Sequence, residues 1–180
     1  MQMISSILFA LSFAAAIAAS LLKGRKMGMI LTLIFCNNFL GAMGYLVGGS
    51  GFEGAIVCLI GCAVAVINFL LDSQNKPIPK WLIAIYGGAF VSVNLYLSGL
   101  SPQSIILILA TLAYVASLVQ RNGAKFRVWL LLNVLMWCVY DLVTVSYSAI
   151  LSHAGQLLFT VCGMLFHDRK KKTATRQDNV

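Results

Sequence analysis

The chain has 180 residues, of which 60% are hydrophobic and 10% carry a charged side chain. Because soluble domains usually carry about 25% charged residues, this composition excludes a soluble globular domain and predicts an integral membrane protein. The formal net charge of +8 suggests nucleic acid as a partner, but the Lys and Arg residues lie in short clusters between apolar runs, as membrane topology requires. We therefore expect the lipid bilayer, and not nucleic acid, as a partner.

Seven stretches are long and apolar enough to cross roughly 30 Å of hydrocarbon, which takes about 20 residues in a helix. In chain order, the predicted transmembrane helices cover residues 3–22, 27–47, 52–71, 81–100, 104–119, 128–145 and 149–166. The first stretch has an alternative interpretation as a cleaved signal peptide, since small residues lie near its end. A signal peptide carries its positive charge before the apolar core, whereas here the charge follows it, in KGRK at 23–26.

Lys and Arg residues occupy every second connection between the predicted helices. All thirteen lie in four segments, namely 23–26, 72–80, 120–127 and the tail 167–180. The connections without them are 48–51, 100–104 and 146–148. Under the positive-inside rule the basic connections face the cytoplasm, so we expect a multi-pass protein with its N-terminus outside and its C-terminus in the cytoplasm. The tail is expected to be a disordered anchor attracted to anionic lipid.

The two halves of the chain show a weak internal repeat. AASLLKGRK at 18–26 matches VASLVQRNGAK at 115–125, and each closes one span and opens a basic connection. An offset of about 100 residues then pairs Asn37 with Trp137, Gly41 with Asp141 and Glu53 with His153. The common order of spans and connections is a stronger signal than these identities.

Three crossings end on the side opposite to their start, so a fourth span is needed before a second triplet can repeat the first in parallel. We therefore predict an all-α membrane protein with seven transmembrane helices in a 3+1+3 parallel repeat. The predicted parts are a three-helix repeat at 1–72, a linker loop and fourth helix at 73–103, a second three-helix repeat at 104–166 and the basic tail at 167–180. A substrate site is expected between the repeats near mid-membrane.

Polar side chains follow one face of the sixth and seventh predicted helices, where residues three or four apart lie together. The positions on this face are Asn133, Trp137, Tyr140 and Asp141 in the sixth span and His153 and Gln156 in the seventh. Asp141 and His153 lie at equal spacing from a turn near Tyr147, each about 9 Å below the outer surface at 1.5 Å per residue. We expect these two side chains to face each other.

A carboxylate at this depth costs about 2.5–3.5 kcal/mol on insertion scales, and an interhelical hydrogen bond in a membrane returns roughly 0.6 kcal/mol. Two interpretations of Asp141 and His153 therefore stay open. They form either a satisfied structural pair or a site in a water-filled cavity that binds a polar or cationic cargo or relays a proton. Trp137 and Tyr140 add aromatic faces that suit a ring or a cation, although packing in the core or against lipid explains them too.

The adjacent Asn37 and Asn38 of the second span cannot both face lipid without cost, so at least one should point inward. The predicted substrate-binding set is therefore Asn37, Asn38, Asn133, Trp137, Tyr140, Asp141, His153 and Gln156. The sequence contains no H-E-x-x-H motif and no Gly-rich phosphate loop, so we expect no enzyme, no metal and no cofactor.

The 3+1+3 layout with an outside N-terminus resembles the SWEET/PQ-loop (MtN3-like) superfamily, which includes the PnuC vitamin-precursor transporters. Within it, WCVYD at 137–141 followed by His153 resembles the YgjV-type proteins of the bacterial inner membrane. The resemblance implies a carrier or facilitator that moves a small polar metabolite across the bacterial inner membrane by alternating access, with proton linkage as an option.

The alternative is a non-transporting membrane receptor or scaffold of the same fold, and the oligomeric state stays open. A water-filled cavity that reaches Asp141 favours the carrier, whereas a dry, fully hydrogen-bonded pair of Asp141 and His153 favours the scaffold.

Overall fold

The computed structural model describes residues 1–21, 27–49, 51–120 and 123–177, with side chains throughout these ranges except at 20–21, 123–124, 126–127, 163 and 165–177. The described residues form seven α-helices and no strand. The helices are α1 (Gln2–Leu21), α2 (Met27–Gly48), α3 (Phe52–Ser73), α4 (Lys80–Ser98), α5 (Pro102–Val119), α6 (Gly123–Val143) and α7 (Tyr147–Gln177). Each predicted span falls on one of them.

The largest difference from the prediction concerns the tail. The expectation of disorder after residue 166 is wrong for residues 167–177, whose backbone continues α7 to Gln177. This segment contains neither Pro nor Gly and is rich in Lys and Arg, which favour a helix. Residues 178–180 of the tail and residues 22–26 and 121–122 of the basic connections lie outside the described residues, and so do the side chains of the tail.

Short turns set where the helices begin and end. Ser101 caps α5, because its hydroxyl accepts a hydrogen bond from the backbone N–H of Ser104 at 3.1 Å, and Pro102 occupies the first helical position, where no N–H is needed. Val145, between α6 and α7, has a φ of 54°, a left-handed conformation that a β-branched residue rarely adopts. This turn holds α6 and α7 close together.

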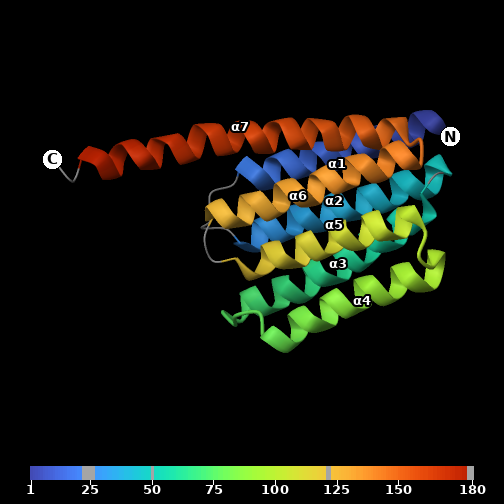
Figure 1. The fold of residues 1–180 in the computed structure, drawn as a ribbon, viewed down its shortest axis with the longest axis horizontal. Coiled ribbons are helices and arrows are strands. Elements are labelled where there is room, and N and C mark those ends of the chain that lie inside the picture. The colour runs from blue at the N-terminus through green and yellow to red at the C-terminus, as the bar shows by residue number, and fades with distance from the viewer. Residues whose placement is uncertain (22–26, 50, 121–122, 178–180) are drawn as a thin grey trace.

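The helices pack as two groups of three. Within α1–α3 and within α5–α7 the middle helix contacts both of its neighbours, and the groups meet where α1 lies beside α7 and α3 beside α5. Helix α4 lies at one edge of the bundle, mainly against α5 (Figure 1). The N-terminus and the turns α2–α3, α4–α5 and α6–α7 share one end of the bundle, which we call the N-terminal end (Figure 1).

The surface and interior have the polarity of a membrane-embedded protein. Helices α1 to α5 are each long and apolar enough to cross a membrane, and α6 contains a shorter apolar stretch, Val128–Val143. Large apolar side chains such as Ile85 and Leu151 are exposed, while Asn94 and Asp141 are fully buried. Apolar residues outside and polar residues inside are typical of helices that face lipid and satisfy their polar groups within the bundle.

Candidate functional site

The centre of the candidate site is the carboxyl group of Asp141 on α6, which is 0% exposed. Its Oδ1 accepts a hydrogen bond from the hydroxyl of Tyr45 on α2 at 2.5 Å. Its Oδ2 lies 2.5 Å from Nδ1 of His153 on α7. The structure thus brings Asp141 and His153 together, as their spacing predicts, and adds Tyr45 as a third member from the other group of helices.

Local structure explains why these three side chains meet. Asp141 lies two residues before the end of α6, Tyr45 three residues before the end of α2, and His153 six residues after the start of α7. At 1.5 Å per residue, all three lie within about two helical turns of the N-terminal end. The tight α6–α7 turn then sets His153 against the face of α6 that carries Asp141.

Three rings stack beside the carboxyl group. The indole of Trp137 stacks with Tyr45, with ring centroids 6.0 Å apart and planes 25° apart, and with His153, at 5.5 Å and 25°. We call Tyr45, Trp137 and His153 the aromatic stack. Tyr45 and His153 both bond to Asp141 and both stack with Trp137, so the carboxyl group and the indole together hold these two rings in place.

Tyr140 closes the site toward α3. Its ring meets Tyr45 and Trp137 edge-on, with centroids 6.0 and 5.7 Å away, and its hydroxyl accepts a hydrogen bond from the backbone N–H of Gly54 at 3.0 Å. A Cβ at position 54 would lie 2.9 Å from the Tyr140 ring, so this approach of α3 to α6 requires glycine. Tyr140 is 0% exposed.

Helix α1 covers the opposite side of the aromatic stack. The ring of Phe9 meets Tyr45 edge-on at a centroid distance of 5.0 Å and packs on Gly44, where a Cβ would come within 2.9 Å of it. The hydroxyl of Ser5 donates to the carbonyl of Gly44 at 2.8 Å, and that of Ser152 on α7 donates to the carbonyl of Phe9 at 3.2 Å. The site is therefore enclosed by α1, α2, α3, α6 and α7.

Four of the eight predicted residues come together here, namely Trp137, Tyr140, Asp141 and His153. The other four lie about one to two helical turns deeper in the bundle. Asn133 donates to the carbonyl of Ala110 on α5 at 2.8 Å and joins α5 to α6. It lies two turns from Asp141, about 12 Å along the helix, so sharing a face does not bring it to the same site.

The two asparagines of α2 bond or pack within the first group of helices. Asn37 accepts a hydrogen bond from the hydroxyl of Ser12 on α1 at 2.9 Å. The side chain of Asn38 lies against Gly61 on α3. Neither of these contacts involves Asp141. The expectation that at least one of the two asparagines lines a site shared with Asp141 therefore stays a prediction.

Gln156, on α7, has a buried Nε2 without a hydrogen-bond partner in the described part of the chain. Its backbone carbonyl accepts from the hydroxyl of Thr160 in the same helix at 2.7 Å. The amide is one turn deeper in the bundle than His153 and remains unsatisfied, which marks a polar position below the site.

Sequence reasoning missed Tyr45. A signal was present, since Tyr45 follows Gly41 by one helical turn, and the internal repeat aligns Gly41 with Asp141. The repeat therefore pointed to this face of α2 at the depth of the acidic group. The sequence could not show that the hydroxyl bonds across the bundle, because this depends on how the two groups of helices pack.

The pair of Asp141 and His153 can hold one exchangeable proton. With the proton its net charge is zero, either as carboxylate and imidazolium or as two neutral groups, and without it the net charge is −1. The side chain of His153 is 15% exposed while that of Asp141 is 0% exposed, so the imidazole is the member that meets surrounding solvent or lipid. The described residues contain no group of three His, Cys, Asp or Glu side chains that could hold a metal ion.

Comparison of the chain with protein-family models, with curated proteins and with solved structures returned no match.

Proposed function

We propose that this protein is a carrier for a small polar metabolite in a bacterial inner membrane, and that the movement of the cargo is linked to a proton held by Asp141 and His153. Seven helices cross the membrane as two parallel three-helix repeats, α1–α3 and α5–α7, with α4 as the linker. The N-terminus is outside and the C-terminus is in the cytoplasm. The proposal agrees with the resemblance of the sequence to the SWEET/PQ-loop superfamily.

The observation that carries the proposal is a carboxyl group that is 0% exposed yet bonded to both groups of helices, to Tyr45 of the first and to His153 of the second. A buried carboxylate costs several times what one hydrogen bond in a membrane returns, so such groups usually mark ion or substrate pathways. Because Asp141 bonds to both groups of helices, a change in its hydrogen bonds changes the strength of the interaction between the two groups.

In this mechanism the described arrangement is the closed state. Both carboxyl oxygens are occupied, and Phe9, Trp137 and Tyr140 cover the site. Opening requires Tyr45 to leave Asp141, which frees one oxygen and one face of the aromatic stack for a polar cargo. Release of the proton leaves the pair with a net charge of −1, which favours renewed hydrogen bonding to Tyr45 and closure.

The test starts from a thermal-shift screen of the purified protein against small metabolites, because a ligand that binds only the folded state at 100 times its Kd stabilises it by about 2.7 kcal/mol. The best ligand is then followed in proteoliposomes that contain a pH-sensitive dye. Asp141→Asn should abolish the proton-dependent part of uptake if the pair relays a proton, and should only weaken binding if Asp141 contacts the cargo.

The matched control is Asp72→Asn, which makes the same chemical change at an exposed position at the end of α3. Its uptake and dye signal should equal those of the wild type. Unchanged, proton-dependent uptake by Asp141→Asn would remove Asp141 from the mechanism.

A non-transporting receptor or scaffold is the second candidate, and the same hydrogen bonds favour it. Asp141 is 0% exposed and both of its carboxyl oxygens are bonded, which is the arrangement that we expect from the sequence for a scaffold and not for an open carrier. Carbodiimide labelling of Asp141 in liposomes separates the two, since a carrier that opens exposes the carboxyl group and a static cross-link does not. Absence of labelling over hours, together with no ligand from the screen, would favour the scaffold.

A further inference from the structure

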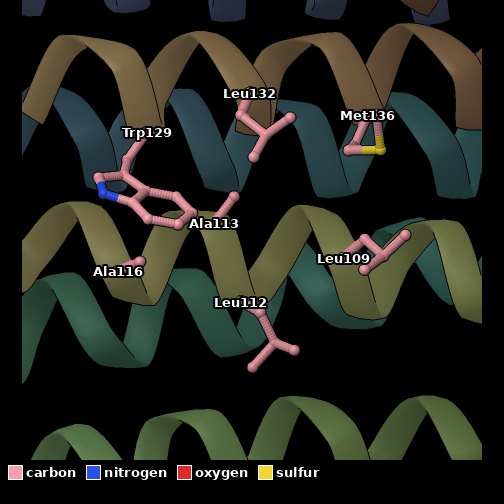
Figure 2. A pocket seen from close by; sticks show the side chains of 7 residues that line it. All are labelled: Leu109, Leu112, Ala113, Ala116, Trp129, Leu132 and Met136. Atoms are coloured by element: carbon pink, nitrogen blue, oxygen red, sulfur yellow. The ribbon is translucent and has the colours of Figure 1, made fainter. Parts of the chain in front are cut away.

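An apolar groove runs along the outside of the bundle between α5 and α6, away from the candidate site. It has a volume of about 460 Å³ and is lined by Leu109, Leu112, Ala113, Ala116, Trp129, Leu132 and Met136 (Figure 2). Helix α5 contributes two small side chains, Ala113 and Ala116, to the lining. Trp129 and Ala116 lie at one end of the group while Met136 and Leu109 lie at the other (Figure 2).

The groove covers about 10 Å along α6 and begins one turn inward of Lys125. Trp129 precedes Met136 by seven residues on α6, which is about 10 Å along the helix, and Lys125 lies a further turn outward. From Lys125 to Met136 the distance is therefore roughly 16 Å, close to half of the ~30 Å hydrocarbon core. The groove thus begins near one membrane surface and ends near the middle.

Its outer end carries positive charge. Lys125 is exposed and precedes Trp129 by four residues, so both lie on the same face of α6. On the α5 side, Gln120 follows Ala116 by one turn, and its Nε2 donates to the Ala116 carbonyl at 3.2 Å. The basic connection between α3 and α4 lies at the same end of the bundle as the start of α6 (Figure 1).

We propose that this groove binds one acyl chain of an anionic phospholipid whose headgroup lies against Lys125. The apolar lining matches the chain, the roughly 16 Å from Lys125 to Met136 match one leaflet, and the ammonium group beyond the outer end matches a negative headgroup. Trp129 suits this place, because its indole has an apolar body and a polar N–H, a combination enriched where the hydrocarbon meets the headgroups. A second copy of the chain is a less suitable occupant, because its net charge of +8 would be repelled by the basic end of the groove. We therefore assign the groove to a lipid.

The experiment uses the full-length protein carrying Trp81→Phe, which removes an exposed tryptophan from the background, while Trp137 stays buried. It is reconstituted in phosphatidylcholine vesicles with an equal mole fraction of either brominated phosphatidylglycerol or brominated phosphatidylcholine. Bromine quenches tryptophan fluorescence on contact. We expect stronger quenching by the anionic lipid, and loss of this quenching when Trp129 is also changed to Phe.

Lys125→Gln should lower the preference for the anionic lipid by about fivefold, the value of roughly 1 kcal/mol for one lysine near a membrane surface. The matched control is Lys80→Gln, which removes the same charge from an exposed lysine at the start of α4. Ala116→Leu, which fills the groove, should reduce quenching by both lipids.

Equal quenching by the two lipids would overturn the proposal, because the groove would then not distinguish the headgroups. An equal effect of Lys80→Gln and Lys125→Gln would overturn it in favour of general surface charge. Absence of quenching by either lipid would also overturn it, since a second copy or another partner would then cover the groove. None of these results depends on transport.

Discussion

Replacing Tyr45 with Phe removes a single buried oxygen atom near the N-terminal end of the bundle. The hydroxyl donates to Oδ1 of Asp141 at 2.5 Å, and both side chains are at most 1% exposed. The Phe ring keeps the contacts with Phe9 and Trp137, so the change isolates the hydrogen bond. No solvent reaches Asp141 to replace it.

The expected cost follows from these facts. Hydrogen bonds between membrane helices contribute about 0.6 kcal/mol on average and up to about 1.7, whereas a buried acceptor left without a partner costs about 1–3 kcal/mol. Since Asp141 is fully buried, we expect Tyr45→Phe to lower the free energy of unfolding by about 1–2 kcal/mol.

The assay is reversible unfolding in mixed detergent micelles, performed as a double-mutant cycle with Asp141→Leu. In the Asp141→Leu background the Tyr45 hydroxyl has lost its acceptor, so Tyr45→Phe should cost nothing there. The control is Tyr114→Phe, because the buried hydroxyl of Tyr114 has no hydrogen-bond partner among the described residues, and its loss should be neutral or stabilising. A coupling energy below about 0.3 kcal/mol would refute the role given to this hydrogen bond.

Two further predictions concern backbone positions around the site and use the same unfolding assay. Gly54→Ala should destabilise by about 1–3 kcal/mol, because its Cβ would lie 2.9 Å from the Tyr140 ring, whereas Gly88→Ala, with nothing within 4 Å, should be neutral or stabilising by up to about 1 kcal/mol. Equal effects at the two glycines would contradict the packing described. Val145→Gly should stabilise by about 0.5–1 kcal/mol, because it relieves a left-handed conformation with a φ of 54°. A loss of stability there would show that the Val145 side chain contributes more than the strain costs.

The helices and one contact were predictable from the sequence for local reasons. Runs of apolar residues separated by Gly, Pro and basic residues predict helices at positions close to those observed, since a backbone in lipid must satisfy its own hydrogen bonds. The contact of Asp141 with His153 was predictable too, because a tight turn relates two neighbouring helices directly.

The contacts of Asn133 and Tyr45 could not be predicted from the sequence. The periodicity of α6 placed Asn133 on the same face as Asp141, but its amide bonds to the carbonyl of Ala110 on α5. Helical spacing gives the face of a residue and not the neighbour that the face meets. The same limit hid Tyr45, which lies 96 positions from Asp141 in the chain.

The amino-acid sequence by itself determined the apolar composition, the positions of the helices and the pairing across the α6–α7 turn, because each depends on residues close together in the chain. Only the tertiary structure decided that α2 places a tyrosine hydroxyl on the acidic group, that Trp137 stacks with both Tyr45 and His153, and that α5 and α6 leave a groove near Lys125. These features depend on how helices distant in sequence pack, which is set by the fit of many side chains at once.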